Sequence, residues 1–343
     1  MKSATIRDVA RAANVSVATV SRALNRGETV SMPTRVRVLD AAGALDYVPH
    51  SGARSLSTSR TDTIGVLLPD LHGEFFSELI RGIDQATRAH KLHLLLSHSH
   101  GDPQEAMAVL KAMRSRVDAM LVMSPYADGA LLSGALNGAV PLVLMGGGGD
   151  AGAHPSFAID NRAGAVAITS HLLDAGYRRI GFIAGPADNI EAGQRLSGYR
   201  AALAARSIAF EQIVQGDFGE RSGFVGAGLL MAAGPPDAIF AANDMMAIGA
   251  LEALRGAGLD VPGDVALAGF DDIPVARFLD PPLTTAGVPI AEIGRRAVEC
   301  CIAMVADGTG GPGHIFTPEL VVRASSGPGK QDRPNGRLIR EEV

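Results

Sequence analysis

The chain has 343 residues, of which 47% are hydrophobic, and its formal net charge is −5. This length exceeds that of one typical domain, and the apolar fraction suffices for well-buried cores, so we expect a globular, multidomain protein. No apolar run approaches the roughly 20 residues that span a bilayer, and the N-terminus lacks the apolar stretch of a secretory signal. We therefore expect a cytoplasmic protein with no membrane partner. Adjacent Cys300 and Cys301 predict no disulfide.

The charges are distributed unevenly along the chain. Residues 1–60 contain one lysine and eight arginines against four acidic residues, a net charge of +5, which leaves −10 for the remainder. A charge run is more often only a solvated face, but a basic segment also concentrates affinity for phosphates. Each phosphate contact then makes binding weaker in salt. The N-terminal segment is therefore the predicted nucleic-acid-binding end.

Residues 5–25, TIRDVARAANVSVATVSRALN, carry the strongest local signal in the chain. Thr5 can cap a first helix, Asn14 tolerates the left-handed conformation of a tight turn, and Ser16 can cap a second helix. Two short helices joined in this way form a helix-turn-helix, whose second helix enters the DNA major groove. The sequence therefore predicts an all-α head, with a third helix over residues 31–45.

Residues 49–61 differ in composition from the segments on either side. Pro49 breaks the preceding helical pattern, and the Ser, Thr and Gly that follow are typical of a linker. Residues 50–57 can form about two helical turns, which are too short to be stable without a partner. Leu56 would then be free to wedge between base steps in a minor groove. The alternative is a disordered tether in which Leu56 is a stray hydrophobe.

Residues 62–326 alternate apolar strands with amphipathic helices in two successive sets. The first set runs from TIGVLLP at residue 63 to FAIDN, and the second runs from a helix over residues 161–175 to VALAGFDD. This alternation predicts parallel, doubly wound sheets covered on both faces, with ligands at the carboxyl ends of the strands. The predicted fold class is α/β with two lobes, preceded by the helix-turn-helix head.

Several motifs, in this order, resemble the lactose-repressor (LacI/GalR) family of bacterial transcription regulators. They are the helix-turn-helix, the hinge segment PHSGARSL, TIGVLLPDLHGEFFSELIRGID, RRIGFIAGP followed by RLSGYRAAL, and DAIFAANDMMAIGALEALRGAGLDVPGDVALAGFDD followed by PPLTT. The resemblance covers about residues 5–326. It implies effector lobes with the fold of periplasmic sugar-binding proteins, a small molecule in the cleft between them, and allosteric control of DNA binding.

The resemblance also implies the limits of each part of the chain. The head is expected over residues 1–48, the hinge helix and linker over 49–61, the effector domain over 62–326, and a flexible tail over 327–343. Lobe one is expected over about 62–160 and 288–317, and lobe two over about 161–287 and 318–326. The crossings are placed near Asp160, Gly287 and Thr317.

The implied partners are operator DNA and a second copy of the chain. The heads of a homodimer would occupy two half-sites of a near-palindromic operator, with hinge helices paired over its centre, which adds Ala53 and Leu56 to the DNA contacts. The tail has no leucine heptads, so a coiled-coil tetramer is not expected.

The side chains of the second helix differ in the DNA groups, bases or phosphates, that they can recognise. Arg22 can form a bidentate pair with guanine. By the resemblance, Val17 and Ala18 stand at base-reading positions, where they only pack against thymine methyls or admit a base pair by shape. Hydroxyl and amide side chains suit phosphates, although Ser16 is equally suited to capping. The candidate DNA contacts of the head are Thr5, Ser16, Val17, Ala18, Thr19, Ser21, Arg22 and Asn25.

The resemblance places candidate effector-binding residues in the cleft. A sugar suits planar bidentate partners for its hydroxyls and an aromatic ring for its C–H face. Arg195 is the strongest candidate, because a charge entering a cleft needs a partner. Asn243 also suits a helix N-cap and Asp271 a turn, and one of Phe75 and Phe76 is expected in the core. The candidates are Phe75, Phe76, Arg195, Phe218, Asn243 and Asp271, followed by Ser124, Asn189, Asp160 and Glu191 as weaker ones.

No motif predicts a cofactor, a metal or catalysis. His98 and His100 form an H-x-H pair without an evident third ligand, and exposed loop histidines are the better interpretation. Residues 146–150, GGGGD, lack the spacing of a phosphate loop and are expected to form a mobile loop. An enzyme would need a nucleophile paired with a base, and no such motif is present.

Alternative functions stay open at this point. A sugar-binding component of a transporter would need export, for which no signal is present. Among regulators, a repressor is favoured over an activator, and a sugar over a nucleobase or nucleoside as effector. The chain contains no tryptophan, which leaves Phe218 as the predicted stacking ring for a sugar.

Overall fold

The structure is a computed structural model, and it describes residues 4–25, 30–47, 60–126, 140–146, 154–309 and 311–327, together with residues 134, 136 and 138. The chain divides into two compact units, Met1–Asp62 and Thr63–Val343. Each unit has a hydrophobic core of its own.

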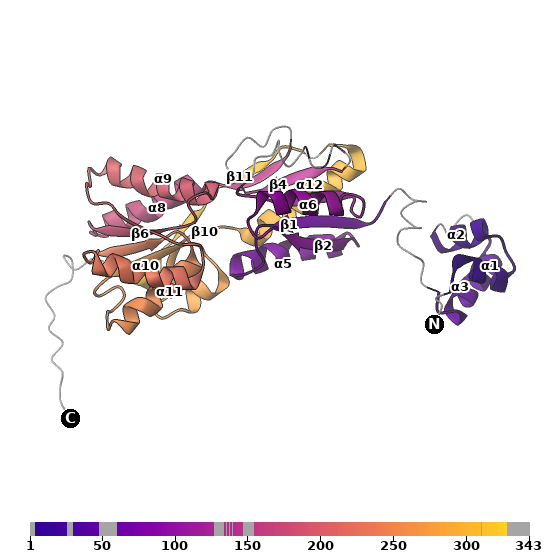
Figure 1. Ribbon diagram of the computed structural model, residues 1–343, viewed down its shortest axis with the longest axis horizontal. Coiled ribbons are helices and arrows are strands. Elements are labelled where there is room, and N and C mark those ends of the chain that lie inside the picture. Colours follow the sequence, from indigo (N-terminus) through magenta and orange to yellow (C-terminus); the bar gives the residue numbers. More distant parts are fainter. Residues whose placement is uncertain are drawn as a thin grey trace, which may run out of the picture. The chain divides into compact units, whose positions relative to one another are not determined.

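The described residues of the first unit form three helices, drawn in indigo in Figure 1. Its helices are α1 (Ile6–Ala13), α2 (Val17–Asn25) and α3 (Met32–Ala44). Val9, Val20 and Val38, one from each helix, are fully buried. The head therefore folds around a small apolar core, as the spacing of these residues predicts.

Local hydrogen bonds cap the starts of α1 and α2, and a left-handed residue makes the turn between the two helices. The Asp8 carboxylate accepts a hydrogen bond from the backbone N–H of Thr5 at 3.0 Å and another from its hydroxyl at 2.6 Å. Asn14 adopts a left-handed conformation with φ of 50°. Ser16 Oγ accepts a hydrogen bond from the Thr19 N–H at 3.1 Å, which caps α2.

The second unit contains two six-stranded sheets, and the first sheet forms lobe one. Its strand order is β11-β5-β4-β3-β1-β2, with every pairing parallel. The strands are β1 (Thr63–Leu68), β2 (His93–His98), β3 (Ala119–Met123), β4 (Leu142–Met145), β5 (Ser156–Ile159) and β11 (His314–Phe316). Helices α5 (Glu74–Ala89) and α12 (Ile290–Asp307) cover one face, and α6 (Pro103–Met113) covers the other.

The second sheet forms lobe two, with the strand order β12-β10-β9-β8-β6-β7. Its strands are β6 (Ile180–Ala184), β7 (Gln212–Gln215), β8 (Ala238–Ala241), β9 (Ala266–Asp271), β10 (Thr284–Gly287) and β12 (Glu319–Val321). Helices α8 (Asn161–Asp174) and α9 (Ile190–Ala205) cover one face, and α10 (Glu220–Ala232) and α11 (Asp244–Gly256) cover the other (Figure 1). The 3₁₀ turns η2 (Pro274–Phe278) and η3 (Ala324–Ser326) complete the lobe.

The chain passes between the two sheets three times, after β5, after β10 and after β11. Parallel strands direct their carboxyl ends toward the other lobe, so the chain that leaves β11 enters lobe two from the cleft side. As a result β12 runs away from the cleft and pairs antiparallel with β10, which is the exception to the parallel sheets expected from the sequence. Otherwise the predicted α/β fold class with two lobes is confirmed.

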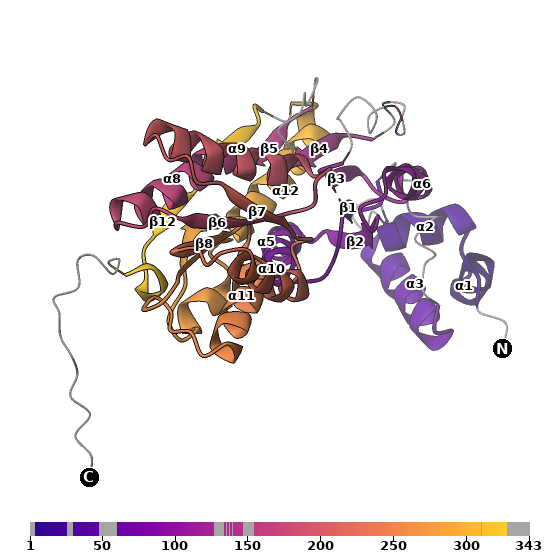
Figure 2. The same cartoon turned by 60° about the vertical axis from the view of Figure 1, so that its left-hand side comes forward.

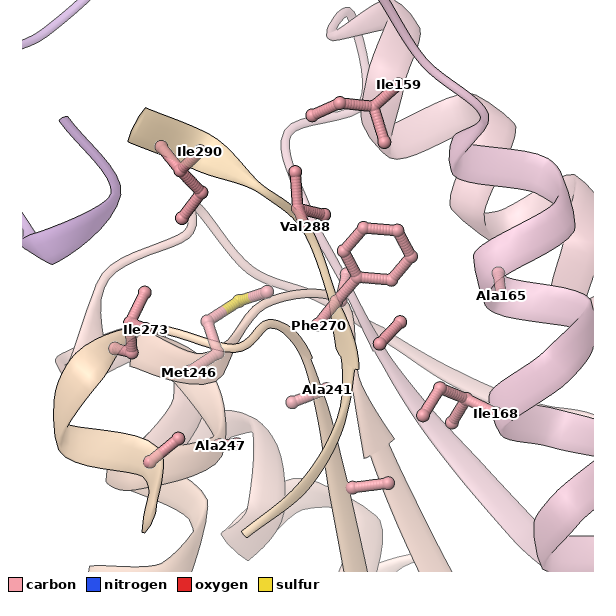
Figure 3. Packing of buried hydrophobic residues seen from close by; sticks show 14 of the residues in the cluster. Ile159, Ala165, Ile168, Ala241, Met246, Ala247, Phe270, Ile273, Val288 and Ile290 are labelled. Carbon is pink, nitrogen blue, oxygen red and sulfur yellow. The ribbon is translucent and has the colours of Figure 1, made fainter. Parts of the chain in front are cut away.

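Buried apolar side chains pack the crossing after β10. Val288 and Ile290 follow this strand and are 8% and 5% exposed. Figure 3 shows Phe270 beside Val288, on the side facing the helix that carries Ala165 and Ile168. All of these residues belong to one cluster that spans both lobes, so the crossings are anchored in the core.

Helices α10 and α11 lie side by side and approach each other at glycines (Figure 2). A Cβ atom added at Gly249 would clash with the carbonyl oxygen of Glu220, and one added at Gly223 would clash with the carbonyl oxygen of Met246. The two backbones are thus in direct contact, which only glycine permits.

We predict that Gly249→Ala lowers the free energy of unfolding by about 1–3 kcal/mol, because the added methyl forces the two helices apart. Gly256→Ala, in the same helix, meets no atom within 4 Å. This control should leave the stability unchanged or raise it by up to about 1 kcal/mol, since alanine favours the helix. Urea unfolding of both variants makes the comparison, and equal effects would contradict the helix contact.

Candidate functional site

A cavity of about 370 Å³ lies between the two lobes. Its walls come from residues at or just after the ends of β1, β2, β3, β7, β8 and β9, and from the first turns of four helices. These are the positions at which α/β sheets bind ligands. The lining residues are Pro69, Asp70, His72, Gly73, Phe75, Phe76, His100, Gly101, Met123, Pro125, Tyr126, Asn189, Glu191, Arg195, Asp217, Phe218, Gly219, Glu220, Asn243, Met245 and Asp271.

Arg195 on α9 is 4% exposed and makes three hydrogen bonds within the cavity wall. Its Nε donates to Asn161 Oδ1 at 2.8 Å, its Nη1 to the Ala242 carbonyl at 2.5 Å, and its Nη2 to Asp271 Oδ1 at 3.2 Å. Its guanidinium carbon lies 3.9 Å from the centre of the Phe270 ring. A buried cation needs such partners, so the wall holds Arg195 in one position.

Asp271 ends β9 and is 3% exposed. Burial raises its pKa to about 6, although the positive charge of Arg195 opposes this and the nearby Glu191 carboxylate adds to it. Its φ of 110° lies in a region that side-chain-bearing residues rarely adopt. Strained backbone of this kind is concentrated at binding sites, where the surrounding packing maintains it.

A second carboxylate, that of Asp244, lies behind the wall and is fully buried. It accepts a hydrogen bond from Thr285 Oγ1 at 2.7 Å and another from the Ile273 N–H at 2.9 Å. Burial, and then the charge of Asp271, raise the pKa of Asp244 well above its usual value. Asp244 does not line the cavity, so these bonds point to a role in fixing the loop after β9.

Two asparagines combine helix capping with a place in the wall. Asn243 Oδ1 accepts a hydrogen bond from the Met246 N–H at 3.0 Å, and its Nδ2 donates to the Phe218 carbonyl at 3.0 Å. Asn189 Oδ1 accepts a hydrogen bond from the Ala192 N–H at 2.9 Å. Both amides are thus N-caps as well as lining residues.

Three phenylalanines supply the aromatic surface expected of the cavity. Phe75 and Phe76 begin α5 and meet edge to face, with their ring centres 5.4 Å apart. One of the two was expected in the core; both rings are half-buried, both pack against the core cluster and both line the cavity. Phe218 follows β7 with φ of 72°, and its ring centre lies 5.7 Å from the Arg195 guanidinium carbon.

Of the ten cleft candidates, only Ser124 and Asp160 lie outside the cavity lining. Ser124 is half-buried between two lining residues, and Asp160 accepts a hydrogen bond from the Ala163 N–H at 2.9 Å to cap α8. The sequence reasoning missed several polar residues of the rim. They are Asp70, His72, His100, Tyr126, Asp217 and Glu220.

A signal for these missed residues was present in the sequence. Asp70, His100 and Asp217 each stand two residues after the last residue of a strand, where loops meet the ligand in α/β folds. His100 was expected to be an exposed loop histidine. It is exposed, with Nδ1 3.0 Å from Glu105 Oε2, but it also lines the cavity.

In the head, α2 presents Val17, Ala18 and Arg22 to solvent. Arg22 Nε donates to the Ala18 carbonyl at 3.3 Å, and among the residues that the structure describes no carboxylate pairs with this guanidinium. Thr5 and Ser16 are exposed and act as caps, while Thr19 and Ser21 are half-buried. The side chain of Asn25, together with Ala53, Leu56 and the rest of the hinge, lies outside the described residues.

The described residues hold no group of three or more His, Cys, Asp or Glu side chains arranged to bind a metal ion. Within the same part of the chain, every helix is too short or too polar to cross a lipid bilayer. The GGGGD segment beyond Gly146 and the tail from residue 328 onward fall outside the described residues.

Comparisons with known proteins agree with this architecture. The family model for bacterial regulatory proteins of the lacI family matches residues 5–50, and that for a periplasmic binding protein-like domain matches residues 169–326. The HTH-type transcriptional regulator GalS of Salmonella typhimurium is 36% identical over 333 residues, which cover 94% of this chain and 96% of the relative. The chain therefore belongs to the lacI family of bacterial regulatory proteins, whose relatives are transcriptional regulators and not enzymes.

Solved structures of relatives show the same fold. The lac repressor dimer bound to operator and the anti-inducer ONPF has a TM-score of 0.84 and 26% identity, covering 95% of this chain and all of that one. A complex of the transcriptional regulator CelR with cellobiose has a TM-score of 0.69 and 32% identity, covering 94% and 99%.

We predict strong energetic coupling between Arg195 and Asp271. Arg195→Met should lower the free energy of unfolding by about 3–5 kcal/mol, because it leaves a buried carboxylate without its cation. The double variant Arg195→Met/Asp271→Asn should lose about 1–3 kcal/mol less than the sum of the single variants. Urea unfolding of the four proteins measures this coupling.

The exposed pair Arg200–Glu211 is the matched control, with side chains 54% and 44% exposed. Its coupling should be below about 1 kcal/mol, because solvent screens an exposed pair. Additive losses at Arg195 and Asp271 would show that the buried pair is not an energetic unit.

Proposed function

We propose that this chain is a sequence-specific, operator-binding repressor whose affinity for DNA is set by a sugar bound in the cavity between the lobes. The observation that carries the proposal is that the cavity wall comes from both lobes, so a ligand can favour one arrangement of the lobes over another. Three crossings connect the lobes, and such connections serve as hinges in proteins that close around ligands.

Contacts across the cleft support this mechanism. Glu74, at the start of α5, accepts a hydrogen bond from the Val275 N–H in lobe two at 3.1 Å. At the rim, His72 Nε2 lies 3.8 Å from Glu220 Oε2. These contacts join lobe one to lobe two, so a change in lobe arrangement has to break or remake them.

The DNA end of the mechanism follows from the head and from family membership. Arg22 would read guanine, Val17 and Ala18 would pack against base edges, and hydroxyl groups would bind phosphates. A cytoplasmic homodimer would place two heads on a near-palindromic operator, with Leu56 as the wedge in the minor groove. No cofactor takes part in this scheme.

The cavity residues have distinct roles in the proposal. Arg195, Asn243 and Asp271 would bind hydroxyl groups, while Phe75, Phe76 and Phe218 would contact the C–H face of the sugar. Asn189 would contribute from the cavity wall, and Ser124 from just outside the lining. Stacking on these rings would also suit a nucleoside, so nucleosides belong among the ligands tested.

The proposal is tested by screening sugars and nucleosides for a rise in Tm and then for an effect on operator affinity. A ligand that binds only the folded state stabilises it, and we expect at least one sugar to do so. The same sugar should change the Kd for operator by about 5- to 150-fold, the usual range of allosteric coupling. A sugar that stabilises the protein without changing the Kd would contradict allosteric control.

We predict that Arg22→Ala weakens binding to the operator by about 5- to 150-fold, the equivalent of 1–3 kcal/mol for a bidentate guanine contact. Binding to random DNA should weaken much less, because it depends on phosphate contacts that do not vary with the sequence, and the loss of a base contact leaves these in place. Arg200→Ala removes the same charge from lobe two and serves as the control. Fluorescence anisotropy with both DNAs makes the measurement, and equal losses on both would rule out base reading by Arg22.

A further inference from the structure

Helix α3 of the head is apolar on two opposite faces. Val38 and Ala42 are buried in the core of the head, whereas Met32, Val36 and Leu39 are 66%, 48% and 46% exposed. Val36 and Val38 are two residues apart and therefore point about 200° apart around the helix. A helix that is apolar all round is typical of one that is covered on both sides, so the exposed face is expected to have a partner.

The exposed residues of α3 have the spacing at which two helices pack against each other. Met32, Val36, Leu39 and Gly43 follow one another at intervals of four, three and four residues, which are the intervals between the a and d positions of a heptad repeat. An added Cβ atom at Gly43 would meet no atom within 4 Å, so this end of the row is open. Together these four residues form the outer face of α3.

Charged residues on either side of the outer face are complementary to each other. With Val36 at position a, Arg35 occupies the preceding position g and Asp40 occupies the following position e. Residues at e and g form ion pairs between the two helices of a coiled coil. In a parallel pair of identical helices, Arg35 therefore lies beside the partner's Asp40, and the two-fold symmetry repeats this ion pair.

Arg35 is available for such an ion pair. Its Nε is buried and has no hydrogen-bond partner in the part of the chain that the structure describes. Among the same residues, neither Arg35 nor Asp40 forms an ion pair. A buried donor without an acceptor costs free energy, and a carboxylate beside this guanidinium would supply the missing acceptor.

The outer face is too small to join two free molecules. Three large apolar side chains per copy fall well short of the roughly 1,200 Å² that a stable protein–protein interface buries. Two heads carried by one homodimer are in a different situation, because tethering raises their effective concentration to about the millimolar range. The partner that fits this face is therefore the second head of the same dimer.

On the basis of the homodimer in the proposed function, we propose that the two heads of the DNA-free dimer pair through the outer face of α3, as parallel helices. Val36 and Leu39 pack against the same two residues of the second copy, and Arg35 pairs with the partner's Asp40. No residue of the outer face is a candidate DNA contact, so the pairing uses a surface that the operator does not need.

Cysteine crosslinking of the full chain tests the pairing. Gly43→Cys places a thiol in the outer face, and Ala44→Cys, at the adjacent exposed residue, is the matched control. Without DNA, oxidation should link the Gly43→Cys chains at least about tenfold faster, because a disulfide needs two Cα atoms within about 7 Å of each other. The native Cys300 and Cys301 are 6% and 0% exposed, and the unaltered chain measures their contribution.

Exchanging the charges tests the predicted ion pairs. In the Gly43→Cys chain, Asp40→Arg should slow crosslinking about threefold or more, because both ion pairs become repulsive. Adding Arg35→Asp restores the pairs with the charges exchanged and should restore the rate. No recovery in a chain whose Tm is unchanged would overturn the parallel pairing. If Arg35→Asp unfolds the head, the comparison of Gly43→Cys with Ala44→Cys still decides.

Sedimentation and operator binding of the same proteins separate this inference from the proposed function. Equal crosslinking of Gly43→Cys and Ala44→Cys in a dimeric chain would overturn the inference alone, as would crosslinks that join two dimers into a larger species. A monomeric chain would overturn the inference together with the homodimer. Crosslinking within a dimer that prefers no DNA sequence would support the inference and contradict the proposed function.

Discussion

The buried guanidinium of Arg195 is the interaction on which the wall of lobe two depends. It joins α9 to Asn161 at the start of α8, to the carbonyl that follows β8, and to Asp271 at the end of β9. These segments are far apart in the sequence, and α9, the segment after β8 and the end of β9 each supply lining residues of the cavity. A buried cation is stable only when it is hydrogen-bonded and paired, so these contacts hold the wall in position in the absence of a ligand.

Each lobe supplies part of the cavity wall, and three connections join the lobes. This construction suits a protein that changes between two arrangements of its lobes. The crossing after β10 is anchored by buried side chains, and the contacts across the cleft include the hydrogen bond from the Val275 N–H to Glu74. The lobes can therefore shift as bodies without unpacking their cores, which is how domain closure usually proceeds. In the proposed function, ligand binding at the wall and DNA binding at the head are linked through such a shift.

The accuracy of the sequence reasoning differed from element to element. The turn around Asn14 and the cap at Ser16 were predictable, since both depend on residues within a few positions. The direction of β12 was missed, because it follows from the side at which the chain re-enters lobe two and not from the residues of the strand. The division of Phe75 and Phe76 between core and cavity was not predictable, since at the first turn of α5 both rings pack against the core cluster and also line the cavity.

The head, the alternation of strands and helices, the two-lobed fold class and the family could all be predicted from the residues alone, because periodicity, caps and motifs are local patterns. The assembled fold was needed to show which polar residues share the cavity, that Arg195 pairs with Asp271, and that Glu191 of lobe two lies close to Gly146 of lobe one. These relations join residues tens of positions apart across a cleft. Their distances, burial and charge balance come into existence only when both sheets are assembled.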